Sequence, residues 1–556
     1  MYQSIENISI QRRFVNLESR QVHYRISGEG PVLLLLHQSP TSSAEKATII
    51  EDFSDDFTVI APDTPGFGLS DYIETLTPDI TLYAQALKEF IDALGLENIS
   101  IYGFHTGAII AAEMARLYPD LCNTVVVNGL VVLEPEEEEE ILKHYTEWFA
   151  PTPEGGHLAW VWARIREQLI FFPWFRKDKG SKLHIDLPDP EFLQPYILDL
   201  LRSTADSQTA YQAAFMYPSR DRIQEINTPT FLLNYVGDPI AEHPKRLKKV
   251  SDSVEIELLP DIPSLEIRAR EIFKKYSTPL ETRIHQEDVS LINGRKNFIQ
   301  TSKGPLYFYC NGDSTKPITL VLHDFSQSSK AMISMSDYFD SSSCKIFIDL
   351  PGHGETGPTH LTNYSPQSMM QMIFEAIKNL GINDIKIISL GVSSSVALLL
   401  SQHTNLNVEK LLLIDPWCLN KEERLEFAED YAPNLSPSVY GEHLLKAWYF
   451  VRDSELFFPW NKTKESNALT KEPKINPDEL HEKAVDALKS GELLKLVAKD
   501  LIGYDIEADL ANIKTECNIF TQRGNGREKF AEKINLHLEN STIEELPKDE
   551  SKWSIT

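Results

Sequence analysis

The segment ISIYGFHTGAIIAAEMA (99–115) places one histidine where acid–base chemistry is possible. Its apolar, β-branched start, ISIY, predicts a buried strand, and the Ala-rich part after Gly107 predicts a helix. Gly103 and Gly107 relieve crowding at a tight turn between strand and helix, so the residue between them is held exposed at the helix N-terminus. That residue is His105, whose imidazole can act as a general base or, more rarely, as a nucleophile.

The elements that must position this histidine alternate between strand and helix patterns. Strands are predicted at VLLLL, FTVIA, ISIY, NTVVV, TFLLNY and VEIELL in the first half of the chain. Their near-continuous apolar runs are typical of strands buried on both faces, which favours a mostly parallel sheet covered by helices. A long helical, aromatic-rich insertion at about 134–225 interrupts this alternation.

The second half of the chain repeats the first. VLLLLHQSPTSS, around His37, matches ITLVLHDFSQSS, around His323, 286 residues later. At the same spacing DTPGFG matches DLPGHG, and the segment from GGHLAWVW to FFPW matches the segment from GEHLLKAW to FFPW. Matches this far apart at one spacing predict two copies of one domain. A polar stretch without helical periodicity at 277–292 is the predicted linker.

Composition narrows the classes of partner. The chain of 556 residues has 54 Lys and Arg against 82 Asp and Glu, a net charge of −28. Nucleic acids and anionic membranes bind basic surfaces, so neither is expected as a main partner. The five cysteines are scattered without a CxxC pair, and the N-terminus has no apolar signal region, so a cytoplasmic protein with reduced thiols is expected.

On these residues the chain resembles the α/β-hydrolase superfamily. The resemblance rests on His37 after the third strand, D-x-P-G-F-G-x-S from Asp63 to Ser70, the turn at Gly103–Gly107 and the helical insertion. It covers nearly the whole chain twice. It implies a tandem α/β fold, in which each domain is a mostly parallel sheet flanked by helices with a helical cap. It does not fix the reaction, because the superfamily includes esterases, epoxide hydrolases, dehalogenases and lyases.

Two departures from the superfamily pattern occur together. Histidine replaces the usual serine at the turn, and no histidine follows the last strand, where the segment reads DIPSLEIRAR. The usual acid position is filled by Asp238 in YVGDP. We therefore expect the longer side chain of His105 to reach Asp238 and form a His–Asp dyad. The resemblance implies backbone N–H groups of Thr106 and of Gln38 or Ser39 as oxyanion donors.

Other interpretations stay open for the same residues. His105 could be a relic and Asp238 a loop cap, and a metal is not expected because no second ligand stands at suitable spacing. The second copy has Gly391 at the turn and Asn525 at the acid position, which predicts a non-catalytic partner.

The caps keep a shared pattern of G-x-H and FFPW. This is typical of packing, but His157 or Arg166 could instead reach the pocket. Together with Ser39, Phe104 and Trp174 they are the candidate substrate-binding residues.

The sequence thus predicts a domain at 1–276 with a cap at about 134–225, and a degenerate domain at 293–556 with a cap at about 420–510, the two repeats packing together. The predicted function is a cofactor-free hydrolase or lyase acting on a small apolar ester or carbonyl compound. The alternative is a catalytically inactive binding or scaffold protein.

Overall fold

The structure is a computed structural model that describes residues 10–74, 77, 79–203, 205–279, 284–285, 289–547 and 552–556. The chain divides into two compact units, of which the first ends at Glu287 and the second begins at Asp288. Residues Pro151–Ala159 group with the second unit, although they precede it in the chain. The predicted linker at 277–292 lies partly outside the described residues.

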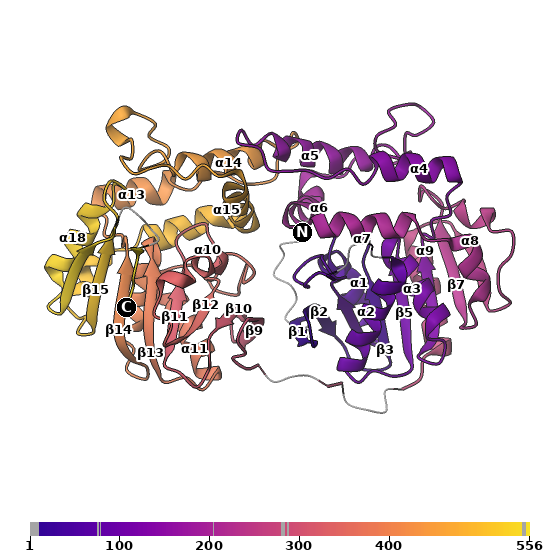
Figure 1. Ribbon diagram of the computed structural model, residues 1–556, viewed down its shortest axis with the longest axis horizontal. Helices are drawn as coiled ribbons and strands as arrows, with labels where there is room; N and C mark the ends of the chain where they lie inside the picture. The colour runs from indigo at the N-terminus through magenta and orange to yellow at the C-terminus, as the bar shows by residue number, and fades with distance from the viewer. Residues whose placement is uncertain are drawn as a thin grey trace. The chain divides into compact units, whose positions relative to one another are not determined.

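The first unit contains one eight-stranded sheet of order β1-β2-β4-β3-β5-β6-β7-β8 (Figure 1). Its strands are β1 (Gln11–Asn16), β2 (Gln21–Ser27), β3 (Val32–Leu36), β4 (Thr58–Pro62), β5 (Ile99–Phe104), β6 (Cys122–Asn128), β7 (Thr230–Tyr235) and β8 (Val254–Leu259). Strand β2 runs antiparallel to β1 and β4, and all other neighbours are parallel. The predicted, mostly parallel sheet is confirmed.

Helices cover both faces of this sheet. Successive residues of β3 alternate between two hydrophobic clusters, with Leu34 and Leu36 in one and Leu33 and Leu35 in the other. The helices α2 (Ile80–Ala93) and α3 (Thr106–Leu117) pack into the first cluster, while α1 (Ala47–Phe53) and α9 (Ile262–Tyr276) pack into the second. This alternation follows from the two-residue period of a strand, and it explains why the strand sequence is apolar throughout.

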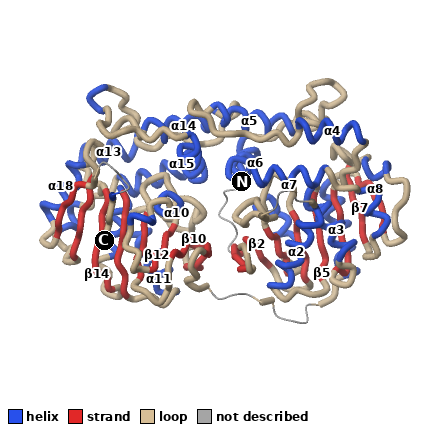
Figure 2. The backbone as a smooth tube through the Cα atoms, in the orientation of Figure 1, coloured by secondary structure: helices blue, strands red, loops and turns tan. Residues whose placement is uncertain are grey.

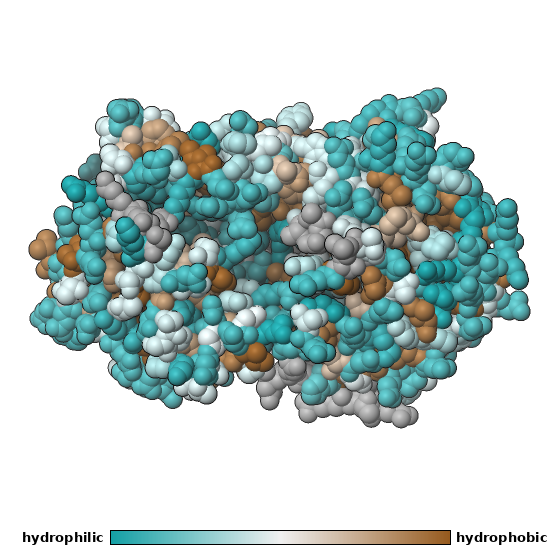
Figure 3. Space-filling view, viewed as in Figure 1, coloured by the Kyte–Doolittle hydropathy of each residue, from teal (hydrophilic) through white to brown (hydrophobic). Residues whose placement is uncertain are grey.

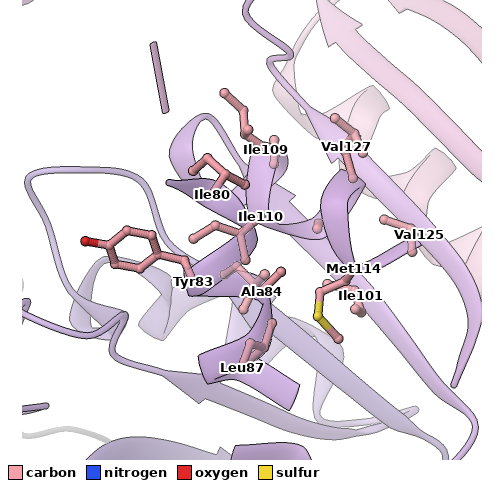
Figure 4. Close-up of a cluster of buried hydrophobic side chains, with 14 of the residues drawn as sticks. Ile80, Tyr83, Ala84, Leu87, Ile101, Ile109, Ile110, Met114, Val125 and Val127 are labelled. Carbon is pink, nitrogen blue, oxygen red and sulfur yellow. The ribbon is translucent and has the colours of Figure 1, made fainter. Parts of the chain in front are cut away.

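Part of the first cluster joins helices and strands around the predicted turn. Figure 4 shows Ile80, Tyr83, Ala84 and Leu87 of α2 against side chains of α3, β5 and β6. The other labelled residues are Ile101, Ile109, Ile110, Met114, Val125 and Val127. Burial of these side chains supplies the main stabilising free energy and holds α3 firmly behind the turn at His105.

The segment between β6 and β7 is the helical cap insertion, of which Pro151–Ala159 group with the second unit and the rest with the first. Its helices are α4 (Pro135–His144), α5 (Gly156–Gln168), α6 (Pro190–Arg202), α7 (Ala205–Phe215) and α8 (Ser219–Arg222). Glu134 is the N-cap of α4 and forms a capping box with Glu137, and Glu136, Glu137 and Glu138 lie in the first turn, where negative charge suits the helix dipole.

The second unit repeats this architecture (Figure 2). Its sheet has the order β9-β10-β12-β11-β13-β14-β15-β16, which is the order of the first sheet. The strands are β9 (Arg295–Thr301), β10 (Gly304–Asn311), β11 (Ile318–Leu322), β12 (Cys344–Ile348), β13 (Asp384–Leu390), β14 (Asn407–Ile414), β15 (Glu516–Thr521) and β16 (Ser541–Glu545). The tandem fold predicted from the internal repeat is therefore confirmed.

Helices of the second unit fall into the same two groups. Those beside the sheet are α10 (Ser329–Ile333), α11 (Pro366–Asn379), α12 (Ser394–Leu400) and α18 (Glu528–His537). Those between β14 and β15 are α13 (Lys421–Asp430), α14 (Glu442–Asp453), α15 (Pro477–Ser490), α16 (Leu493–Val497) and α17 (Glu507–Leu510).

Each unit joins the loops after its third and fourth strands through one buried histidine. His37 Nε2 accepts a hydrogen bond from the Thr64 N–H (2.9 Å), and its Nδ1–H donates to the Gln38 carbonyl (2.7 Å). His323 makes the same two bonds, with the Leu350 N–H (2.9 Å) and the Asp324 carbonyl (2.8 Å). These bonds fix the loop that follows the third strand, next to the turn that carries His105 or Gly391.

The described surface is largely polar. Hydrophilic residues dominate the face shown in Figure 3, and hydrophobic residues are scattered among them. Among the described residues, no helix combines the length and the apolar character needed to cross a bilayer.

Stability of the second unit should depend on pH through His353, which replaces Phe67 of the first copy. His353 is fully buried, and burial lowers its pKa to about 3. An unfolded histidine titrates near pH 6.5, so between about pH 6.5 and 3 the unfolded chain binds a proton that the folded chain does not. Stability is therefore lost as the pH falls through this window. We expect His353→Phe to reduce this loss, measured by urea unfolding at pH 7 and pH 5.

His360→Phe, at a histidine of the same unit that is only half-buried, serves as the matched control and should change the slope less than His353→Phe does. Equal slopes for His353→Phe and the parent chain would contradict the assignment.

Candidate active site

His105 lies on a strained turn between β5 and α3. Its backbone has φ 48° and ψ −108°, and residues other than glycine rarely adopt a positive φ. A Cβ at Gly103 would lie 2.2 Å from the Gly107 carbonyl oxygen, and a Cβ at Gly107 would lie 2.5 Å from the Leu36 carbonyl oxygen. Both glycines are therefore required for the close approach of strand and helix, as the sequence predicts, and strain of this kind clusters at functional sites.

The turn brings His105 to Asp238. The imidazole Nε2 lies 3.0 Å from Asp238 Oδ2, although 133 residues separate the two in the chain. Asp238 follows β7 and also accepts a hydrogen bond from the Ile240 N–H (2.8 Å). The carboxylate side chain is fully buried, whereas 31% of the histidine side chain is exposed. The arrangement is thus a buried acid that holds a partly accessible imidazole.

The charge state of Asp238 defines which nitrogen of the imidazole carries its proton. Burial raises the pKa of the Asp238 carboxyl, but the adjacent His105 and the Ile240 N–H more than offset this, so the pKa lies below its ordinary value. An ionised carboxylate can only accept hydrogen bonds, so Nε2 is the donor. The lone pair of a neutral His105 then lies on Nδ1, which is the atom available to take a proton.

Gly129, immediately after β6, makes room for this imidazole. A Cβ at Gly129 would lie 2.3 Å from His105 Cδ2 and 2.9 Å from His105 Nε2, and the glycine has φ +84°. Sequence reasoning missed this residue, although the tripeptide Asn-Gly-Leu at the end of a predicted strand could have drawn attention to it. The dyad depends on the absence of a side chain here.

Phe104 covers the other side of the histidine ring. The two rings are stacked with centroids 4.1 Å apart and an interplanar angle of 26°. Lys46 Nζ lies 4.3 Å from the centroid of the Phe104 ring and 2.8 Å from Glu45 Oε1, and both charged side chains are 5% exposed. Burial raises the pKa of Glu45, but the neighbouring Lys46 more than offsets this effect. The pKa of Glu45 is therefore lowered, and the two side chains form an ion pair.

The predicted oxyanion donors differ in whether their N–H groups already donate to an acceptor within the protein. Thr106 is the first residue of α3, so its N–H has no acceptor within the helix. The Gln38 N–H donates to Glu45 Oε1 (3.2 Å), and the Gln38 side chain donates to Glu45 Oε2 (3.0 Å). The Ser39 N–H makes only a long contact of 3.4 Å with Thr106 Oγ1, and the Ser39 hydroxyl has no hydrogen-bond partner among the described residues.

The second unit shows how the same place is filled without a histidine. Asp324, at the position of Gln38, accepts hydrogen bonds at Oδ1 from the N–H groups of Phe325 (2.8 Å) and Val392 (2.9 Å). Its Oδ2 accepts from Arg527 (3.1 Å). A Cβ at Gly391 would lie 2.1 Å from Asp324 Cγ, so the carboxylate occupies the space in which a side chain at the turn would begin.

Asp415 stands where the first unit has Gly129. It keeps the positive backbone angle (φ 45°), and its Oδ1 accepts hydrogen bonds from the Gln522 N–H (2.9 Å) and from Thr521 (3.2 Å). A residue with a side chain thus stands where the first unit has the glycine that makes room for the imidazole.

The remaining candidate residues lie in the caps. His157 accepts a hydrogen bond at Nδ1 from the Thr152 N–H (3.1 Å), as His443 does from the Ser438 N–H (3.2 Å), and its Nε2 lies 3.1 Å from His481 Nδ1. Burial, followed by the nearby His481, lowers the pKa of His157 to about 4. These contacts fix the start of a cap helix, and among the described residues no hydrogen bond joins His157 to the dyad.

Trp174 and Arg166 also have local partners. Trp174 Nε1–H donates to the Tyr145 carbonyl (3.2 Å), and Trp460 donates to the Tyr431 carbonyl (2.7 Å) in the same way. Arg166 forms a loose ion pair with Glu167 (3.7 Å). The structure thus brings together His105, Asp238, Phe104 and Thr106, and it places the cap residues in packing contacts.

Comparisons with known proteins agree with this architecture. Residues 31–249 match the family model described as alpha/beta hydrolase fold. The chain is 33% identical over 119 residues to haloalkane dehalogenase 2 of Mycobacterium tuberculosis (21% of this chain, 42% of the relative). It is 27% identical over 157 residues to fluoroacetate dehalogenase of a Burkholderia species (26% and 51%). The matched parts are thus less than two thirds of either relative.

A solved esterase from Thermogutta terrifontis aligns with 48% of this chain and all of its own length, at a TM-score of 0.37 and 21% identity.

Space at Gly129 should be necessary for the dyad. We expect Gly129→Ala to push the imidazole away from Asp238 and to destabilise the first unit by more than about 1 kcal/mol, because φ is positive there. The displacement can be measured from the ¹⁵N chemical shifts and the tautomer of His105, and the stability from urea unfolding. Gly95→Ala, also at positive φ but with open space around its Cβ, is the matched control. An unperturbed His105 tautomer in Gly129→Ala would contradict this steric role.

Proposed function

Because this chain belongs to the α/β-hydrolase superfamily, we propose that its first unit is a cofactor-free enzyme in which His105 is the general base and Asp238 orients it. The observation that carries the proposal is the 3.0 Å hydrogen bond between a partly exposed imidazole and a buried carboxylate at a strained turn. In the usual arrangement three residues share this task. Here two residues supply the base and its orienting acid, and none supplies a seryl nucleophile.

The proposed substrate is a small, largely apolar ester or similar carbonyl compound. For an ester, Nδ1 of His105 removes a proton from water while the water oxygen bonds to the carbonyl carbon. The tetrahedral intermediate collapses as the bond from carbon to the alkoxy oxygen breaks, and the imidazolium returns its proton to the departing alkoxide. Asp238 stays ionised and stabilises the transient imidazolium. Abstraction of an acidic C–H or O–H proton, as in a lyase, would use the same nitrogen.

Backbone N–H groups of Ser39 and Thr106 are the donors that we propose for the developing oxyanion. The support comes from the second unit, where the carboxylate of Asp324 accepts hydrogen bonds from Phe325 and Val392, which occupy the equivalent positions. In the first unit the Gln38 N–H already donates to Glu45. Preorganised donors of this kind contribute most when they point at charge that develops in the transition state.

A binding or scaffold protein without turnover is the second candidate. The engagement of Gln38 with Glu45 favours it, because that bond removes one of the N–H groups expected to stabilise an oxyanion. The candidate substrate-binding residues His157, Arg166 and Trp174 would then serve packing alone.

Turnover on a panel of esters, lactones and β-diketones distinguishes the two candidates. We expect His105→Ala to lower kcat/KM by about 100-fold to 10,000-fold, the usual contribution of a general base. Asp238→Asn should lower kcat by a similar order, since an amide can stabilise the wrong imidazole tautomer. The exposed His184→Ala is the control and should retain full activity. Full activity of His105→Ala on a confirmed substrate would exclude the dyad, and no turnover of any compound by the parent chain would favour the binding protein.

A further inference from the structure

The second unit contains a cavity of about 490 Å³ beneath its cap. Its size lies in the range of small-molecule sites. Aromatic side chains form much of its wall, namely Phe325, Trp417, Tyr431, Phe450 and Phe458. Cap helices α14 and α15 also contribute residues, including Val451 and Lys483. The cavity therefore lies where the fold accommodates a ligand, in the copy that has lost its catalytic side chains.

At the floor of this cavity, the N–H groups that would stabilise an oxyanion already have an acceptor. Asp324 takes both N–H groups that would stabilise an oxyanion, and Arg527 compensates its charge at 3.1 Å. The guanidinium also lies 5.3 Å from the centroid of the Trp417 ring. A molecule that enters the cavity meets a fixed, neutralised ion pair and no nucleophile, so it would be bound without conversion.

A local positive excess lies on the wall. Glu455 is shared by two lysines, with Lys483 Nζ at 2.7 Å and Lys471 Nζ at 3.0 Å. The carboxylate is almost buried; burial raises its pKa, but the two ammonium groups more than offset this and bring it to about 2, so it is ionised and the cluster carries one surplus positive charge. The first copy has apolar or neutral residues at these positions, which are Leu169, Ile185 and Tyr196. The cluster is thus specific to the second unit.

Two other acids of the lining, Glu482 and Asp486, have cationic partners, and the partner of Asp486 is shared with Glu355 (3.1 Å). Glu482 pairs with Lys330 (2.7 Å), and Asp486 pairs with Lys489 (3.0 Å). Six acidic and five basic residues line the cavity, so the two lysines on Glu455 form a local basic site in a lining that has one more acid than base. An ammonium group that is partly desolvated and shares its carboxylate keeps free donors for a second anion.

We propose that the second unit binds a small, largely apolar carboxylate in this cavity, with the carboxylate on Lys471 and Lys483 and the apolar body against Phe325, Tyr431 and Phe450. The unit is then a ligand-binding domain that retains the fold and the cavity of an enzyme. This inference does not depend on catalysis by the first unit, and its test requires no turnover.

Isothermal titration calorimetry on the full chain tests this with naphthalene-2-acetate and its neutral amide, naphthalene-2-acetamide. We expect saturable binding of the acetate and at least tenfold weaker binding of the amide. Lys471→Gln and Lys483→Gln should each weaken binding of the acetate by about tenfold, the contribution of one charge-assisted contact. Neither substitution should change the affinity for the amide. Lys330→Gln, which removes the cation of a one-to-one pair, should change neither.

A cavity-filling pair of variants assigns the site to one unit. Ser454 lines the cavity, and Gln168 is its equivalent in the first copy. Ser454→Trp should abolish binding, and Gln168→Trp should not, with thermal melting as the check on folding. The proposal is overturned if the amide binds as tightly as the acetate, if neither compound binds at millimolar concentration, or if Gln168→Trp rather than Ser454→Trp removes binding. If a lysine variant does not fold, the comparison of acetate with amide on the parent chain still decides.

Discussion

A side chain as large as imidazole fits at the turn after β5 only because three surrounding positions have none. Gly103 and Gly107 allow strand and helix to approach within contact of their backbones, and Gly129 leaves the volume into which the ring extends. The ring then spans the distance to Asp238, and the carboxylate holds it in one orientation. Everything proposed for the first unit depends on this local lack of Cβ atoms, because the ring would otherwise turn away from the acid.

The two copies use the same backbone and fill the same space in opposite ways. In the first copy, the side chain of His105 fills the space beside the turn. The neighbouring positions are Gly129, which has no side chain, and Gln38, which donates hydrogen bonds to Glu45. In the second, the turn has Gly391, and volume comes from two carboxylates, Asp324 and Asp415. A close-packed interior does not tolerate both solutions at once, since the Asp324 carboxylate lies where the Cβ of a side chain at Gly391 would be. Where the first copy has a histidine paired with an acid, the second copy has an ion pair between Asp324 and Arg527.

The two copies also differ in how they place charged side chains. The first unit has a partly exposed imidazole next to a buried acid, an arrangement suited to proton transfer. The second pairs the buried Asp324 with Arg527 and places two lysines on the single carboxylate of Glu455. Proton transfer requires a group that can change its charge, whereas binding an anion requires one that does not. Lysine and arginine, which remain protonated at neutral pH, meet the second requirement.

The sequence by itself determined the fold, its duplication and the turn that carries His105. Apolar runs such as VLLLL mark strands buried on both faces, and matches at one spacing mark a repeat, because both signals are patterns of residue type along the chain that can be read without knowing which side chains meet. The pairing of His105 with Asp238 was also expected, but only through resemblance to a superfamily. Tertiary structure alone decided that Gly129 is the residue that admits the ring, that the Gln38 N–H is taken by Glu45, and that the cap residues His157 and Trp174 have local partners. It also decided that the second copy encloses a cavity with two lysines on one carboxylate. These features depend on which distant side chains converge and how much space remains between them, and neither quantity has a periodicity that a sequence can display.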